Sequence, residues 1–78
     1  MELTFKRRNH YGITVWESNE TVTDCCIEIP RFRIVKEDGE YVVREKFVGF
    51  GYVYSTNTAH ERKLKDTIYC LNINLHRI

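Results

Sequence analysis

Residues 31–54 read RFRIVKEDGEYVVREKFVGFGYVY, and more of the fold follows from this segment than from any other part of the chain. Two stretches rich in β-branched and aromatic residues, 31–36 and 40–54, flank the turn-forming residues Glu37-Asp38-Gly39. Two such stretches around a short glycine-containing loop are typical of a β-hairpin. The segment therefore predicts two long antiparallel strands.

The length of the hairpin loop follows from the charges that it brings together. A three-residue loop opposes Lys36 to Glu40, whereas a two-residue loop sets Arg33 against Arg44. Like charges on directly opposed residues are unfavourable by up to about 1 kcal/mol. We therefore expect the three-residue loop, with Gly39 in its left-handed position.

The end of this segment carries a stripe of aromatic residues. Strict alternation in a strand puts Val48, Phe50, Tyr52 and Tyr54 on one face, and a glycine within residues 49–51 marks a bulge or bend. One small domain cannot cover all of these rings, and exposed apolar patches usually mark binding surfaces. We expect part of the stripe to be exposed.

The N-terminal part of the chain also has strand patterns. The first 18 residues contain two alternating stretches around the turn residues Asn9–Gly12, which predicts a hairpin. Residues 21–29 predict a third strand, which ends at Pro30 because proline cannot donate to a β-ladder.

The C-terminal part combines a helix signal with a strand signal. Thr58-Ala59-His60-Glu61 matches a capping box, so we expect a short helix from about residue 59 to residue 67. Residues 69–76 alternate between apolar and polar side chains, which predicts a final strand. The expected fold is mainly β (α+β): one domain spanning residues 1–78, with a twisted antiparallel sheet of five to six strands in meander order and one short helix near the C-terminus.

Length and composition exclude several classes of protein. The chain has 78 residues, 42% hydrophobic and 29% charged, with a net charge of +1, which is typical of a small folded domain. It has neither an apolar run of about 20 residues nor a signal-peptide pattern, so we expect a cytoplasmic protein without a membrane partner. Cys25, Cys26 and Cys70 are odd in number, which indicates reduced thiols.

No residue pattern in the chain indicates catalysis, a cofactor or a metal site. Cys25 and Cys26 are adjacent and would point to opposite faces of one strand, where at least one acts as a small buried hydrophobe. Cys70 and His76 lie about 20 Å apart on the predicted final strand, at ~3.3 Å per residue. Nothing in the spacing places a base near a thiol. We therefore expect a protein that is not an enzyme and needs no cofactor.

The sequence Gly49-Phe50-Gly51-Tyr52-Val53 resembles the central submotif of RNA-recognition-motif domains. The order of elements expected from Phe32 to Ile78 is also similar to the second half of that fold. The resemblance implies that Phe50 and Tyr52 stack on bases while Gly51 and Val53 face the helices. It departs from the family at Val48 and Ser55, where a basic and an aromatic residue are usual, and in lacking helical periodicity between residues 16 and 29.

Two clusters of basic residues accompany this motif, and a single positive patch formed by both would suit a single-stranded nucleic acid. An RNA-binding module is therefore one alternative function. Its candidate residues are Phe50, Tyr52, Lys6, Arg7, Arg8, Arg62, Lys63 and Lys65.

The preferred interpretation is a small non-catalytic protein that binds a macromolecular partner and blocks or modulates it. In size and composition the chain resembles the accessory proteins with which bacteriophages and mobile elements inhibit host machinery, including bacterial defence nucleases. The partner would then be a host protein or a protein–nucleic-acid complex. A structural subunit or homodimer, in which the stripe or an edge strand is used in self-association, is a further alternative. Because aromatic residues and arginine are the usual interface anchors, the candidate partner-binding residues are Phe50, Tyr52, Tyr54, Arg44 and Trp16.

Overall fold

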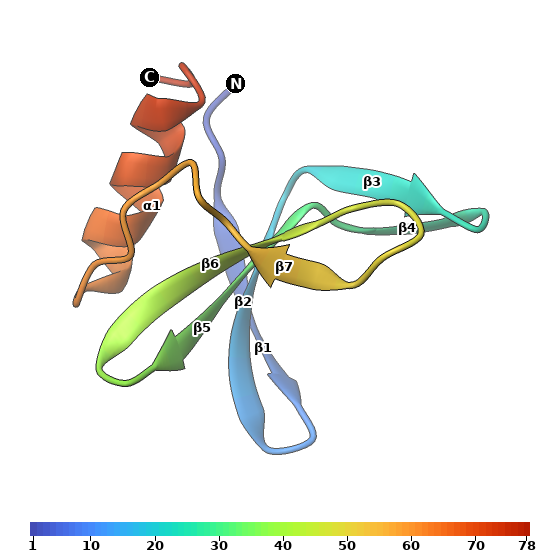
Figure 1. Ribbon diagram of the computed structural model, residues 1–78, viewed down its shortest axis with the longest axis horizontal. Coiled ribbons are helices and arrows are strands. Elements are labelled where there is room, and N and C mark those ends of the chain that lie inside the picture. The colour runs from blue at the N-terminus through green and yellow to red at the C-terminus, as the bar shows by residue number, and fades with distance from the viewer.

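Antiparallel strands and one C-terminal helix form the protein, whose computed structural model describes all residues from Met1 to Ile78 (Figure 1). The predicted mainly β fold with a short helix near the C-terminus is confirmed. The elements are β1 (Phe5–His10), β2 (Ile13–Ser18), β3 (Thr21–Asp24), β4 (Ile27–Pro30), β5 (Phe32–Glu37), β6 (Glu40–Lys46), β7 (Tyr52–Tyr54) and α1 (Leu64–Asn74).

Five strands form one antiparallel sheet in the order β1-β2-β5-β6-β7. This order follows the chain except that β3 and β4 pair only with each other and form a separate hairpin between β2 and β5. In Figure 1 this hairpin extends to the right, away from α1, and the loop that joins β6 to β7 extends in the same direction.

The β1–β2 hairpin is confirmed, with its turn at Tyr11-Gly12. Both turn residues have positive φ, 54° and 83°, as the turn that best matches the twist of paired strands requires. The Asn9 side chain accepts a hydrogen bond from the Gly12 N–H at 2.9 Å and stabilises the turn.

The predicted three-residue loop between β5 and β6 is wrong. The loop has two residues, Asp38-Gly39, with φ values of 52° and 82°, and Arg33 stands opposite Arg44. The two arginines pair with different carboxylates, Arg33 with Glu17 at 3.2 Å and Arg44 with Glu37 at 3.0 Å. These ion pairs offset the repulsion that the opposed guanidinium groups would otherwise cause.

The predicted single strand over residues 21–29 is also wrong, because the chain reverses at Cys25-Cys26 and forms β3 and β4. Both cysteines have positive φ, 51° and 67°, and both are exposed, so neither is the buried hydrophobe that we expected. A left-handed backbone costs an ordinary residue roughly 1 kcal/mol or more. The turn therefore uses a residue type that is poorly suited to it.

Replacing this pair with the residues that such turns favour, Cys25→Asn together with Cys26→Gly, is expected to raise the free energy of unfolding by about 1 to 2 kcal/mol. Urea denaturation measures the change. The matched control is Cys25→Ser with Cys26→Ser, which removes the thiols without relieving the backbone and should leave stability nearly unchanged. Equal stability of the two double variants would contradict the strain argument.

The predicted helix over residues 59–67 and the predicted final strand over residues 69–76 are replaced by α1. The Thr58 hydroxyl bonds to the Ala59 carbonyl and caps no helix, so the capping-box interpretation is wrong. The Thr67 hydroxyl instead accepts the Glu61 N–H at 3.1 Å and donates to the Lys63 carbonyl at 3.0 Å. These bonds fix the segment that leads into the helix.

One face of α1 packs on the sheet because its apolar residues also recur at helical spacing. Leu64, Ile68, Leu71 and Leu75 are three or four positions apart, and they all pack at the core. The pattern of residues 69–76 fits both the two-residue period of a strand and the 3.6-residue period of a helix, and packing against the sheet favours the helix. The fully buried core consists of Leu3, Phe32, Ile34, Val43 and Leu71.

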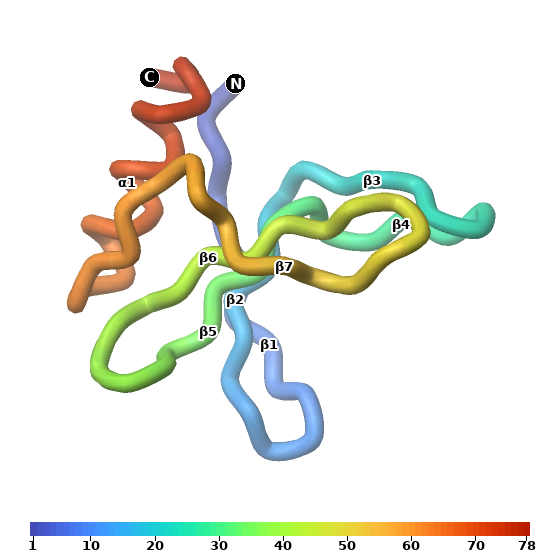
Figure 2. Tube along the Cα trace, viewed as in Figure 1, coloured from blue at the N-terminus to red at the C-terminus, as the bar shows by residue number.

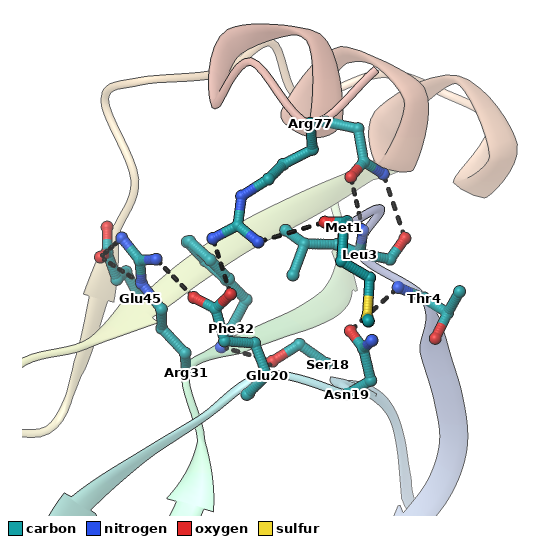
Figure 3. A network of polar contacts seen from close by, with 11 residues as sticks. Met1, Leu3, Thr4, Ser18, Asn19, Glu20, Arg31, Phe32, Glu45 and Arg77 are labelled. Atoms are coloured by element: carbon teal, nitrogen blue, oxygen red, sulfur yellow. Dashed lines mark hydrogen bonds and ion pairs between the residues drawn. The ribbon is translucent and has the colours of Figure 1, made fainter.

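A network of polar contacts holds both chain ends against the sheet (Figure 3). Glu20 lies between two arginines and accepts hydrogen bonds from Arg31 at 2.5 Å and from Arg77 at 2.6 Å. Arg77 also donates to the Met1 carbonyl at 3.1 Å, and Figure 2 shows the two termini side by side. A single carboxylate thus joins the start of β3 to the C-terminus.

This network makes stability depend on pH in the acid range. The hydrogen bond from Arg31 holds the pKa of Glu20 below its ordinary value of 4.5. A carboxyl with a lowered folded-state pKa stabilises the fold above its ordinary pKa, and this contribution is lost as the pH falls through the folded-state value.

Glu20→Gln is therefore expected to lower the free energy of unfolding by about 1 kcal/mol at neutral pH. The difference from the parent protein should shrink as the pH falls below 4.5. Urea denaturation between pH 7 and pH 3 measures it, with Glu2→Gln as the control, since Glu2 is exposed and forms no ion pair. A difference that is constant with pH would contradict this role of Glu20.

Candidate functional site

The aromatic stripe does not lie on one strand, so the period-two geometry predicted for residues 48–54 is wrong. Strand β6 ends at Lys46, the chain turns, and β7 contains only Tyr52–Tyr54. The turn is closed by a hydrogen bond from the Phe50 N–H to the Phe47 carbonyl at 2.9 Å, and Gly49 supplies a positive φ of 83°. A glycine that we expected to bend a strand therefore reverses the chain.

The rings nevertheless remain largely uncovered. In the loop, which we call the Phe47–Phe50 loop, Phe47 is 48% exposed, Val48 64% and Phe50 72%. Tyr54 is 54% exposed on β7, where its ring stacks on His60 with 4.2 Å between ring centroids.

Tyr52 is the exception, because its side chain is half-buried. Its hydroxyl donates to the Pro30 carbonyl at 2.5 Å, and the Arg33 guanidinium lies 4.2 Å from the centre of its ring. Burial raises the pKa of the Tyr52 hydroxyl. Tyr52 therefore joins β7 to the end of β4.

The Lys46 side chain holds the Phe47–Phe50 loop in place. Its ammonium group lies 2.8 Å from the Asp24 carboxylate, and it donates hydrogen bonds to the backbone carbonyls of Phe47, at 3.2 Å, and of Phe50. The side chain is only 9% exposed, so the solvent screens these contacts weakly. The hydrogen bond from Lys46 lowers the pKa of Asp24. Both ends of the loop are thus fixed to the end of β3.

The loop and the β3–β4 hairpin together form what we call the arm, residues 21–30 and 47–51. The contact between Lys46 and Asp24 places its two parts side by side, at the right of Figure 1. The far end of the arm carries exposed side chains without formal charge. These side chains, which we call the arm tip, are Cys25, Cys26, Ile27, Phe47, Val48 and Phe50.

Two other predicted anchors lie away from the arm tip. Arg44 is on β6 opposite Tyr54 and forms two-pronged hydrogen bonds with Glu37. Trp16 is half-buried beside the core, where its ring meets that of Tyr41 edge-on at 5.4 Å. The structure therefore groups Phe50 with residues of the arm rather than with Arg44 or Trp16.

The two basic clusters do not form the single patch that the nucleic-acid alternative assumed. Residues 6–8 lie on β1, at one edge of the sheet, whereas Arg62, Lys63 and Lys65 lie at the start of α1, which contacts β6. Arg62 and Lys63 border a hollow that also contains carboxylates. The RNA-recognition-motif resemblance does not extend to the fold, since Gly49–Gly51 lies outside any strand and the chain ends on a helix.

Sequence reasoning missed Lys46, Asp24 and Ile27 as parts of the site. A lysine directly before a glycine-containing turn could have indicated this contact, because its ammonium group can donate hydrogen bonds to the backbone carbonyls of the turn. The contact with Asp24 joins segments 22 residues apart and had no local signal. Ile27 belongs to the site because the chain reverses at Cys25-Cys26, and the residue types there did not indicate a reversal.

No group of three or more His, Cys, Asp or Glu side chains is placed to hold a metal ion. The largest hollow, about 500 Å³, lies between Glu2 and the α1 residues from Leu64 to Asn72 and is lined mainly by apolar surface. The helix α1 is too short and too polar to cross a membrane.

In comparisons with known proteins, the chain matched no protein-family model, no curated protein and no solved structure.

Proposed function

We propose that this protein is a small non-catalytic binding protein that docks its arm tip onto a partner protein and thereby blocks or modulates it. One observation carries this proposal. The backbone of the Phe47–Phe50 loop is fixed by Lys46, while the three apolar side chains of the loop remain exposed to between 48% and 72%. A rigid backbone that presents uncovered rings is the arrangement expected of a docking surface.

The expected energetics favour binding. Full burial of one large apolar side chain contributes about 1.5 to 3 kcal/mol, so covering the exposed parts of Phe47, Val48 and Phe50 provides several kcal/mol. Ordering a flexible backbone on binding would cost about 1 to 2 kcal/mol per residue. Because Lys46 orders the loop beforehand, most of that cost is absent when the partner binds.

The charges on the surface favour a partner protein over a membrane or a second copy of this chain. The arm tip contains no lysine or arginine, whereas surfaces that bind anionic lipids carry clusters of them. The exposed edge strand β1 carries Lys6-Arg7-Arg8 in succession, and positive charges on an edge discourage strand pairing between copies.

We place this activity in the cytoplasm of a host cell, as that of a bacteriophage or mobile-element inhibitor of host defence machinery. The three unpaired cysteines, two of them exposed, support a reducing compartment. The small size and the protruding arm support inhibition by occupying a site on the partner, either a host protein or a protein–nucleic-acid complex.

Affinity capture from a host lysate, with and without nuclease, tests the proposal. We expect one protein to be retained after nuclease treatment and to be lost with the double variant Phe47→Ser/Phe50→Ser. The control variant Tyr11→Ser/Ile13→Ser, which changes two exposed apolar residues at the far end of β1–β2, should still capture it. Capture of nucleic acid alone, or capture unaffected by the loop variant, would overturn the proposal.

A further inference from the structure

The face of the sheet that α1 leaves uncovered carries a row of charged side chains. The buried residues Phe32, Ile34 and Val43 face the helix, so the residues that alternate with them point to the other side. On that side, a row of residues that stand directly opposite one another in neighbouring strands crosses all five strands of the sheet. Its members, in strand order, are Lys6, Glu17, Arg33, Arg44 and Tyr54.

Positive charge predominates along this row. It contains three cations and a single carboxylate, Glu17. Glu17 forms an ion pair with Arg33 at 3.2 Å and is also approached by Arg8 of β1, at 3.8 Å. Arg44 is paired with Glu37 at the edge of the row. Lys6 makes no ion pair and is exposed. With Arg8 and Glu37 included, this surface carries four cations and two carboxylates, a net charge of +2 on a chain whose total is +1, so positive charge is concentrated here.

The row ends on aromatic surface. The Tyr54 ring has one face on His60 and is 54% exposed, and the neighbouring Tyr52 ring already stacks under the Arg33 guanidinium. Aromatic rings and guanidinium planes are the surfaces on which unpaired bases stack.

We propose that this helix-free face binds a single-stranded nucleic acid, with Lys6, Arg8 and Arg44 at phosphates and Tyr54 beneath a base. Strands lie about 4.8 Å apart, so a row across five strands is about 19 Å long, and it suits a short stretch of about four nucleotides. The exposed Tyr54 ring at the end of the row favours a nucleic acid over a peptide of Asp and Glu residues, because every nucleotide carries a base that can stack on the ring beside the phosphate that pairs with a cation, whereas Asp and Glu side chains offer no ring.

This inference goes beyond the proposed function and rests on other residues. The arm tip contacts a partner protein, whereas the row lies on the sheet. A partner that itself holds nucleic acid would engage both surfaces.

Fluorescence anisotropy with a fluorescein-labelled dT12 oligonucleotide tests the inference. Three phosphate contacts on a single strand predict that affinity falls by a factor of about 20 between 50 and 200 mM salt. The double variant Lys6→Gln/Arg8→Gln should bind more weakly and lose only about threefold over the same range. Tyr54→Leu should weaken binding about tenfold, and Tyr54→Phe should retain it.

Two matched variants separate this face from other surfaces. Arg62→Gln/Lys63→Gln removes the same charge at the start of α1 and should bind dT12 like the parent protein. Phe47→Ser/Phe50→Ser should also bind it normally, even when partner capture is lost. Absence of dT12 binding at 50 mM salt would overturn the inference. So would a Tyr54→Leu variant with unchanged affinity, or displacement of dT12 by polyglutamate as effective as by unlabelled dT12.

Discussion

Replacing Asn72 with leucine is expected to lower the free energy of unfolding by about 3 kcal/mol, a large part of the stability of so small a domain. Asn72 is 1% exposed and holds the N-terminal segment against α1. It accepts the Leu3 N–H at 2.6 Å and donates to the carbonyls of Leu3 and Ile68, both at 3.1 Å. Leucine keeps the volume but leaves the buried Leu3 amide and carbonyl without partners.

Urea denaturation followed by circular dichroism measures this loss. Asn74→Leu is the matched control, because Asn74 lies on the same helix but is exposed and makes no side-chain hydrogen bond. A loss below about 1 kcal/mol for Asn72→Leu, similar to that of Asn74→Leu, would show that these hydrogen bonds are not what holds the N-terminal segment against α1.

Lys46→Met is expected to weaken partner binding about 30-fold, although all the apolar side chains of the arm tip remain. Methionine fills a similar space but donates no hydrogen bonds to the carbonyls of Phe47 and Phe50 and cannot pair with Asp24. The loop must then be ordered when the partner binds, and even partial ordering costs about 2 kcal/mol.

Titration of the captured partner measures the affinity, and hydrogen exchange at the Phe50 amide measures the order of the loop. The amide should exchange faster in Lys46→Met than in the control Lys63→Met, which removes the same charge from an exposed position. Unchanged affinity together with faster exchange would show that a fixed loop is not needed for docking.

Much of the β architecture was predictable because turn residues mark it locally. Asn9–Gly12 and Asp38-Gly39 signal reversals in their own sequence, and both occur. The loop length at Asp38-Gly39 was not predictable from opposed charges, since Glu17, which neutralises Arg33, comes from a third strand. The reversal at Cys25-Cys26 had no signal, because cysteine seldom adopts positive φ.

The prediction for the C-terminal segment was wrong for a different reason. Residues 69–76 satisfy both the strand period and the helix period, and only the position of the sheet decides between them. The exposure of Phe50 was predictable, because a domain of this size cannot bury all of the aromatic rings in residues 48–54. The shape of the site was not predictable, because Gly49 reverses the chain and the contact between Lys46 and Asp24 is tertiary.

Site-specific photo-cross-linking tests the docking claim most directly. A photoreactive benzoyl-phenylalanine is placed either at position 50, in the Phe47–Phe50 loop, or at position 11, in the turn between β1 and β2. After irradiation in the presence of the partner, we expect a cross-link to that partner from position 50 and none from position 11. A cross-link from position 11 alone, or none from position 50 while the partner remains bound, would contradict the account.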